Sequence, residues 1–375
     1  GRRLLTQRDL RQPLNLTDPA THIDYFTAAT RLSQMARDGV SPTDSGYNWD
    51  GEPSAAYWHD MTMPLNGGDQ YQVYGYDPTS SVMQAMYQVY SISSYAGNEV
   101  VGLGNLDLYG YLTDTSGNSH YFCKTPACAE GLPGDSLNNQ ATALFGWSSI
   151  GNSSYHALQL SLRKQSSHGV QFDLNYTFSK STDITSAASR VGFNGGILGS
   201  QLSNAFSLRQ HRAVSDFDVR HQINANWIAE LPFGRGKPLA GDANGVLDAL
   251  VGGWQLSGLF RWTSGYPFSV GNGYAWASDW NYSGLAQMVS KPKTGVYTQP
   301  DSSVSVFANP TEAYGNFTNP FPGQSGSRNV LRGPGYVGVD MGLCKRWRMP
   351  VEGHSLQFRW EVFNVFNQVR FNVQS

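Results

Sequence analysis

Hydrophobic and polar residues alternate along much of this chain, and the alternation is clearest between Tyr155 and Lys180. Successive residues of a β-strand point to opposite faces, so a period of two predicts a strand with one apolar and one polar face. Between the alternating stretches that end at Arg163 and resume at Val170, residues 166–169 are Ser-Ser-His-Gly, which is typical of a turn. The segment is therefore predicted to be a hairpin, and each of its strands has the ~10 residues with which a tilted strand crosses a bilayer.

Four further segments show the same alternation, so six strands share one pattern. They are Val219–Leu231, Trp254–Thr263, Val337–Trp347 and Ser355–Asn364. In the first of these, His221 is the one polar residue on the apolar face. Strands of this kind either cover the core of a soluble sandwich or cross a membrane, and the alternation alone does not decide between the two.

The lengths of the connections favour the membrane. If the turn at 166–169 is periplasmic, the following connections are alternately long and shorter, as in outer-membrane barrels, which have short periplasmic turns and longer extracellular loops. We therefore expect periplasmic turns at 166–169, 232–252 and 348–354, and long extracellular loops at 13–68, 113–154, 181–217 and 265–336. A soluble barrel does not require long and short connections to alternate. Loops of this length are also uncommon in compact soluble domains.

In this arrangement the apolar face contacts lipid and the polar face lines the lumen. An arginine or lysine that faces the middle of the bilayer costs about 2–4 kcal/mol, so charged strand residues are expected to point inward. The expected lumen-facing residues are Gln171, Asp173, Asn175, Arg220, Asn224, Arg261, Asp340, Arg359 and Glu361. The expected lipid-facing residues are Leu158, Leu160, Leu162, Phe172, Leu174, Leu256, Phe260, Phe358 and Trp360. Several aromatic residues, including Tyr176, Trp262 and Trp347, lie near strand ends, where barrels carry aromatic girdles.

Composition agrees with a polar barrel. Charged residues make up 14% of the chain and aromatic residues 13%, and the mean hydropathy is -0.38. No run approaches the ~20 apolar residues of a transmembrane helix. The net charge of -2 excludes the broad basic surface of a nucleic-acid binder, so no nucleic-acid partner is expected.

The first 150 residues consist mostly of connections. Residues Ile23–Arg37 have apolar positions at helical spacing, begin after Asp18 and Pro19, and end before Gly39, which predicts a helix that caps an external loop. Weaker strands are predicted near Gln70–Tyr76, Val82–Ser91 and Val100–Leu112. The total is about 12 strands of an all-β, antiparallel, up-and-down transmembrane barrel.

Other candidate chemistry is sparse. Cys123 and Cys128 lie five residues apart in YFCKTPACAE, and in an oxidising envelope this spacing favours a local disulfide over a metal site. Cys344 stands alone and is predicted to be a small buried residue.

One loop has a loosely calcium-like pattern of oxygen ligands, formed by Asp44, Asn48, Asp50 and Glu52. EF-hand spacing is not met, so a solvated polar loop is the better interpretation and no metal or other cofactor is expected. Asp216, Asp218 and His221 form the densest titratable cluster, but His221 points to the opposite face, and the cluster is better explained as an ion-paired rim of the lumen. No nucleophile or phosphate-loop motif is present, so no enzymatic activity is expected.

Five stretches carry a family resemblance. They are SSIGNSSYHALQLSLRK (148–164), FDLNYTFSKSTD (172–183), SDFDVRHQINANWIAELPFGRGK (215–237), GGWQLSGLFRWTSGYPFSVGNG (252–273) and LQFRWEVFNVFNQVRFN (356–372). They resemble the barrel of Oar-like TonB-dependent outer-membrane receptors, strongly from about Phe145 onward. The resemblance implies a barrel of about 22 strands, an N-terminal plug, and coupling to the TonB system.

The chain departs from that plan, because a signal peptide, a plug and a closing C-terminal strand are not recognised in it. We therefore expect residues 1–375 to form one partial barrel domain, whose partners are the lipid bilayer of the bacterial outer membrane, the plug and the remaining strands. Open strand edges also allow self-association.

Three functions follow as hypotheses. The first is TonB-dependent uptake of a ligand that the sequence does not identify, with ligand choice in the external loops. The second is a structural or adhesive surface barrel, which could be a subunit of a released extracellular assembly joined at its strand edges. The third is a soluble secreted β-protein, which requires Leu158, Leu160, Phe172 and Leu174 to be packed inside.

Overall fold

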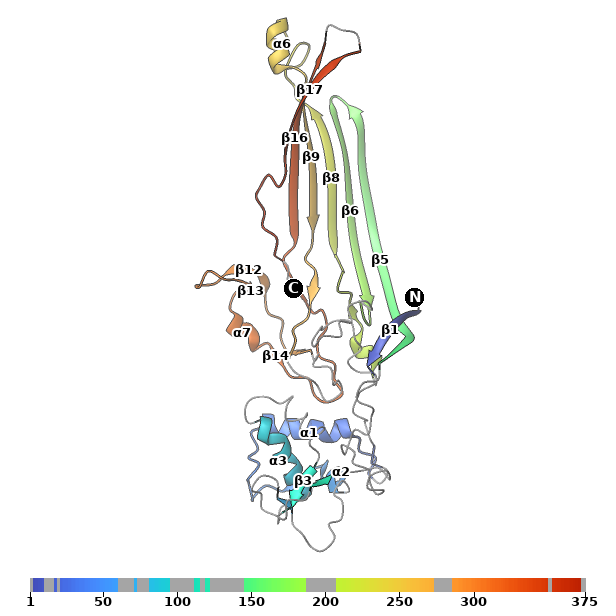
Figure 1. The fold of residues 1–375 in the computed structure, drawn as a ribbon, viewed down its shortest axis with the longest axis vertical. Coiled ribbons are helices and arrows are strands. Elements are labelled where there is room, and N and C mark those ends of the chain that lie inside the picture. Colours follow the sequence, from blue (N-terminus) through green and yellow to red (C-terminus); the bar gives the residue numbers. More distant parts are fainter. Residues whose placement is uncertain are drawn as a thin grey trace.

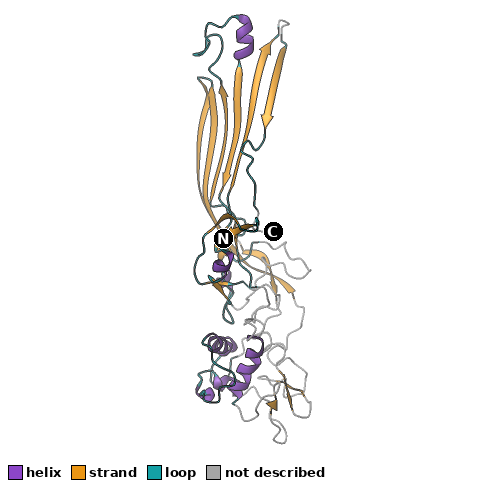
Figure 2. Cartoon of the chain, turned by 90° about the vertical axis from the view of Figure 1, so that its left-hand side faces the viewer, coloured by secondary structure: helices purple, strands orange, loops and turns teal. Residues whose placement is uncertain are grey.

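The computed structural model, shown in Figure 1, describes most of the strand-forming region and parts of the N-terminal third. The described residues are 3–9, 17–18, 21–59, 71–72, 81–94, 111–114, 119–121, 145–186, 207–272, 285–349 and 353–371. Two regions make up the fold: a tall antiparallel sheet, and a helical unit beyond one end of it (Figures 1 and 2).

The main sheet is antiparallel and follows chain order. Along the sheet the strands are β1 (Arg3–Asp9), β5 (Phe145–Ser167), β6 (Val170–Asp183), β8 (His221–Glu230), β9 (Trp254–Thr263), β16 (Tyr336–Arg348) and β17 (Ser355–Val362), and the short β7 (Ala213–Val214) pairs with β6. The six strands that the alternation predicts are all confirmed. Within the described residues the sheet does not close, and β1 and β17 are its two edges.

Some strand boundaries differ from the prediction. Strand β5 begins at Phe145 because its first residues pair with β1, with Trp147 opposite Gln7 and Asn152 opposite Arg3. The end of the stretch predicted as the loop 113–154 is therefore strand. Strand β8 begins at His221, two residues later than predicted, because Val219 and Arg220 belong to the loop.

The register sorts the two kinds of residue onto two faces. Leu162 pairs with Leu174, Leu174 with Ala225, Ala225 with Phe260, and Phe260 with Val339, which makes one apolar row across five strands. One residue further along β6, an equivalent polar row lies on the opposite face: Ser161 pairs with Asn175, Asn175 with Asn224, and Asn224 with Arg261. We call these the apolar face and the polar face of the sheet.

The predicted turn at 166–169 is tighter than four residues. Ser167 pairs with Val170, which leaves His168 and Gly169 as the two central residues. Both have positive φ, 54° and 74°, as two-residue hairpin loops with the twist of a β-sheet require. Glycine meets this requirement without strain, and histidine is among the residues that tolerate it.

The connections leave the sheet at alternate ends. The β5–β6 turn, the β8–β9 connection with helix α6 (Gly245–Val251), and the described residues between β16 and β17 lie at the upper end in Figure 1, while the described parts of the two longer connections lie at the lower end. We call these the short-connection end and the loop end. The shorter elements of the loop end are η2 (Leu208–His211), β10 (Pro267–Phe268) paired with β15 (Leu331–Arg332), β11 (Gln287–Met288) paired with β14 (Phe317–Thr318), β12 (Thr294–Thr298) paired with β13 (Val304–Phe307), and α7 (Pro310–Tyr314).

A helical unit, which we call the cap, lies beyond the loop end (Figure 1). It contains α1 (Tyr25–Arg37), η1 (Trp49–Gly51), α2 (Ala55–His59) and α3 (Val82–Ser94), with the small sheet β2 (Tyr71–Gln72), β3 (Tyr111–Asp114) and β4 (Ser119–Tyr121). Helix α1 confirms the predicted helix, but it begins at Tyr25, two residues later than predicted, and its N-cap is Asp24 and not the predicted Asp18 and Pro19. The Asp24 side chain accepts a hydrogen bond from the Thr27 amide at 2.9 Å, and Gly39 follows the C-cap with φ 77°.

Of the three weaker strand predictions, one lies wholly within the described residues. The strand predicted at Val82–Ser91 is wrong, because this segment is helix α3. Its buried residues Met83, Met86, Tyr87 and Tyr90 recur every three or four positions, which is the helical and not the strand period. Within Gln70–Tyr76 and Val100–Leu112, the structure describes only the short strand β2 and the first residues of β3.

The hydrophobic core of the described residues is concentrated in the cap. Aromatic residues of four helices pack together there, with Trp58 against Tyr57 and Tyr25, and Trp49 against Tyr87. The sheet, by contrast, is a single layer whose large apolar side chains remain exposed. Leu158, Leu160 and Leu174 are exposed and Phe172 is half-buried, so the packing that a soluble barrel requires of them is not found. None of the described helices has the length and apolarity needed to cross a membrane.

Candidate functional site

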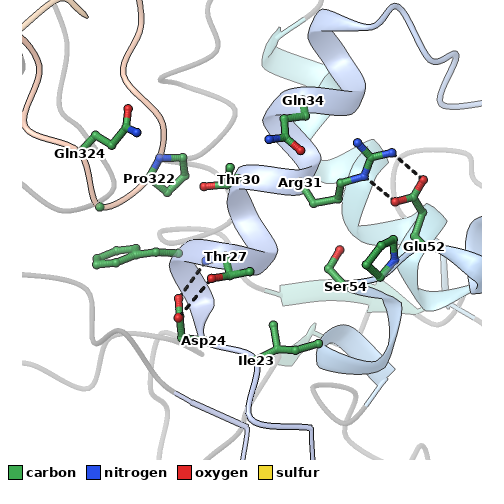
Figure 3. Close-up of a pocket in the computed structure, with 13 residues that line it drawn as sticks. Ile23, Asp24, Thr27, Thr30, Arg31, Gln34, Glu52, Ser54, Pro322 and Gln324 are labelled. Atoms are coloured by element: carbon green, nitrogen blue, oxygen red, sulfur yellow. Dashed lines mark hydrogen bonds and ion pairs between the residues drawn. The ribbon is translucent and has the colours of Figure 1, made fainter.

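A cleft of about 780 Å³ lies in the cap, between helix α1 and the loop that carries Pro322 (Figure 3). Its apolar walls come from Ile23, Phe26, Pro53 and Pro322. Thr27, Thr30 and Gln34 add polar groups along the exposed side of α1 (Figure 3).

The cleft joins segments that are almost 300 residues apart in the chain. Arg37 donates to the Asn319 carbonyl at 2.8 Å, and its guanidinium lies 4.0 Å from the centre of the Phe321 ring. Gln210 donates to the Gly323 carbonyl at 3.0 Å. The cap is therefore attached to the loops of the sheet, and the sequence gives no local signal for this contact.

An ion pair forms one side of the cleft. The Arg31 guanidinium contacts the two carboxylate oxygens of Glu52 at 2.5 and 2.9 Å, and the Tyr47 hydroxyl also donates to Glu52. This fixes α1 against the loop that follows η1. The hydrogen bonds from Arg31 lower the pKa of Glu52 most, and the hydrogen bond from Tyr47 lowers it further. Burial raises this pKa, but by less than the partners lower it.

The cap is expected to lose stability in acid because of Glu52. Its folded-state pKa lies below the ordinary value of 4.5, so the stabilisation is complete above pH 4.5 and is lost as the pH falls through the lower folded value. Near-ultraviolet circular dichroism, which reports the packing of Trp49 and Tyr47, should show this loss as the pH falls below 4.5.

Glu52→Gln is the matched variant, because it keeps the shape of the side chain and removes the charge. Its aromatic signal should be weaker at pH 7 and flatter between pH 3 and pH 5. If the wild type and Glu52→Gln show the same acid transition, then Glu52 is not the group that titrates.

Two residues of the calcium-like loop bind groups of the protein. Glu52 is bound to Arg31 and Tyr47, and an Asp44 carboxylate oxygen accepts from the Gly46 amide at 2.8 Å. Among the residues that the structure describes, no group of three or more His, Cys, Asp or Glu could hold a metal ion. Glu52 is also not solvated as the sequence predicted, since its side chain is 7% exposed.

A second polar cluster lies where the sheet meets the loops, and we call it the rim network. Arg328, with 8% of its side chain exposed, is at its centre. Its guanidinium reaches Asp183 at 2.8 Å, Asp216 at 2.9 Å and Ser186 at 2.6 Å. Arg332 pairs with Asp218, which is almost fully buried. Strand β6 is thus connected to both long connections at the loop end.

The rim network confirms that Asp216 and Asp218 are ion-paired, but their partners were not predicted. Arg328 and Arg332 are more than 100 residues further along the chain. His221 is on the other face, as the alternation predicts: its ring lies 6.0 Å from Trp262 and 6.2 Å from Tyr176, and Tyr176 hydrogen-bonds to it at 2.9 Å. This group is an aromatic row on the apolar face.

The polar residues predicted for the lumen lie along the polar face. Arg163 pairs with Asp173 at 2.8 Å, Asn175 bonds to both Asp173 and Ser161, and Arg359 pairs with Glu361. Gln171, Asn224, Arg261 and Asp340 occupy positions of the same face, and Arg220 lies just before β8. Whether that face encloses a lumen stays a prediction.

The three cysteines have different outcomes. Cys123 and Cys128 lie outside the described residues, so their disulfide stays a prediction. Cys344 is half-buried on the polar face, not fully buried as predicted, and accepts from Gln357 at 2.9 Å.

A single-layered antiparallel sheet with one exposed apolar face and one hydrogen-bonded polar face is the wall of a transmembrane β-barrel. The chain matches the family described as outer membrane beta barrel domain over residues 91–375, and it belongs to that family. The protein is therefore an outer-membrane barrel protein associated with the lipid bilayer of the bacterial outer membrane. Neither the curated proteins nor the solved structures include a match to this chain.

Proposed function

We propose that this chain forms part of the barrel wall and the outer cap of an Oar-like TonB-dependent receptor. Such a receptor takes up a ligand across the outer membrane. The observation that carries this proposal is the cap itself, a folded unit with an aromatic core and a cleft, attached to the loop end of the sheet. A barrel that only anchors itself needs no such unit. In this orientation the apolar face contacts lipid, the polar face lines the lumen, and the cap lies outside the cell.

The cleft favours a neutral ligand with apolar and polar parts. The charged groups that line it already have partners: Arg31 and Glu52 bind each other, and Asp24 accepts from the Thr27 amide and hydroxyl. Hydroxyl and amide groups of Thr30 and Gln34 beside Phe26 suit hydrogen bonds and stacking with a ligand such as a sugar derivative or a short peptide.

Uptake can be tested without knowing the ligand. Cells with the gene and cells without it are grown in a complex medium, and compounds that disappear from the medium are compared by mass spectrometry. We expect one compound class to be depleted only with the gene present, and its depletion to stop when the TonB system is removed. Thr30→Trp, which fills the cleft, should act like the deletion, whereas Asp38→Trp on the exposed end of the helix should not.

Two results would contradict uptake. Depletion that continues without TonB would indicate a passive channel. No difference in the medium, together with loss of cell attachment in the deletion strain, would favour the structural or adhesive function. The observation that favours this second candidate is the pair of sheet edges, β1 and β17, which are unpaired within the described residues and are suited to strand addition.

A further inference from the structure

Helix α6, in the connection between β8 and β9, lies at the short-connection end of the sheet (Figure 1). Asn244 caps its start by accepting from the Leu247 amide at 2.9 Å. It ends at Gly252 and Gly253; a Cβ at Gly252 would collide with Asp248, and Gly253 has φ 72°. The glycine pair allows the chain to leave the helix and enter β9 at once.

Three side chains of the apolar face hold the C-terminal end of α6. Trp254 and Trp347 donate their indole N–H groups to the carbonyls of Leu250 and Ala249, at 2.9 and 2.8 Å. Lys345 donates to the carbonyls of Leu250, at 3.1 Å, and of Gly252. These are carbonyl groups that a helix end leaves without partners within the helix.

The position of Lys345 shows on which side of the sheet α6 lies. Lys345 pairs in register with Trp254 and with Phe358, so it occupies the apolar face although it is charged. It is 1% exposed, and its ammonium lies 5.2 and 5.3 Å from the ring centres of Trp254 and Trp347. The helix end therefore folds over the apolar face and not over the polar face.

The outer side of α6 is apolar and uncovered. Val246, Leu247 and Leu250 are 75%, 44% and 66% exposed, and no residue of the helix is buried. An isolated helix of seven residues is not stable in water by itself. On β17, which is adjacent to β16, Leu356 pairs with Trp347 and Phe358 pairs with Lys345. Both Leu356 and Phe358 are exposed on the apolar face. The apolar surface of α6 therefore continues that of the sheet.

We propose that α6 is an interfacial anchor, which inserts Val246, Leu247 and Leu250 among phospholipids at the boundary of headgroups and acyl chains. The occupant is the bilayer because the surface continues the apolar face, and because two tryptophans and a lysine meet there, the residues that hold membrane proteins at the interface. At the short-connection end, which we expect to be periplasmic, this is the inner leaflet. The inference rests on the apolar face contacting lipid, as proposed above.

The test measures lipid exposure at single positions. The full chain, with Cys123, Cys128 and Cys344 replaced by serine, receives one spin label at Val246→Cys or Leu250→Cys and is reconstituted in vesicles of phosphatidylethanolamine and phosphatidylglycerol. Collision rates with oxygen, which is enriched in lipid, and with a water-soluble nickel chelate are compared. Asp242→Cys, an exposed polar position in the same connection, is the matched control, and Leu162→Cys reports the apolar face.

We expect the oxygen-to-nickel ratio at positions 246 and 250 to exceed that at 242 by at least about fivefold. Nickel access at 246 and 250 equal to that at 242 would overturn the anchor. Protection from both reagents would also overturn it, since the helix would then be covered by protein, for example a second copy. If position 162 is in lipid and positions 246 and 250 are not, only the proposal of the anchor is contradicted. If position 162 is in water, the assignment of the apolar face to lipid is contradicted as well.

Discussion

Leu162→Arg is expected to lower the free energy of unfolding from a phospholipid bilayer by about 2–4 kcal/mol, the cost of a lipid-facing arginine near the midplane. Leu162 is 57% exposed on the apolar face, in the row of Leu174 and Phe260. That row lies between two aromatic positions of β9, Trp254 and Trp262. Eight residues of strand correspond to about 26 Å along the strand, or about 20 Å of height at the usual tilt of about 35–45°, so these positions span most of the ~25 Å apolar band of a barrel.

Gln159→Arg is the matched control, because Gln159 is exposed on the polar face of the same strand and pairs with Thr177. A lumen-facing arginine contacts water, so this variant should unfold within about 0.5 kcal/mol of the wild type. Denaturant unfolding from vesicles gives both values. Equal destabilisation by the two arginines, or a larger effect of Gln159→Arg, would contradict the assignment of the faces.

Arg328→Ala is expected to release the loops from the sheet, at a cost of about 3–5 kcal/mol, because it leaves a buried charge without its partner. Asp183 is 5% exposed and Arg328 8%, so water does not replace the lost pair easily. When loop opening is fast, protease cleavage follows the population of the open form. Limited proteolysis of the protein in vesicles should therefore cut the loop end more than tenfold faster than in the wild type.

Lys237→Ala is the control, because it removes the ion pair between Lys237 and Glu230, whose length of 2.8 Å equals that of the Arg328–Asp183 pair. The side chains of Lys237 and Glu230 are about 40% exposed. Such pairs contribute about 0–1 kcal/mol, so cleavage should stay within severalfold of the wild type. If Arg328→Ala is as resistant as Lys237→Ala, the rim network does not hold the loops.

The faces of the sheet could be predicted from the sequence because they depend on a local period. Leu158 to Phe178 shows the period of two except at the turn and at Lys164, which lies opposite Phe172 on the apolar face, and the observed register agrees with the pattern elsewhere. The body and the end of the cap helix α1 were equally predictable from its apolar spacing and from Gly39, whereas its N-cap, Asp24, was not predicted.

The other features could not be predicted for one of two reasons. Either they depend on contacts between distant residues, or the residue types of a segment favoured the wrong kind of element. Val82–Ser94 contains β-branched and aromatic residues that favour a strand, but its buried positions follow the helical period. The partners of Asp216 and Asp218 belong to a distant loop, so the rim network has no local signature. Lys345 interrupts an apolar face, and only the position of α6 explains how its charge is accommodated.

The candidate cleft was the least predictable part. Helix α1 could be predicted, but the loop of Pro322 that completes the cleft meets it only through the folded connection at the loop end. The calcium-like pattern was interpreted as a solvated polar loop. The ion pair that buries Glu52 against Arg31 could not be predicted, because it requires the packing of α1 against η1 and α2.

The most direct test of the account is a scan of lipid exposure along β5, with one spin label at each position from 157 to 163 in phospholipid vesicles. The account predicts a period of two, with oxygen access high at Leu158, Leu160 and Leu162 and nickel access high at the positions between them. A scan of the opposite phase, or one without a period of two, would show that the apolar face does not contact the membrane.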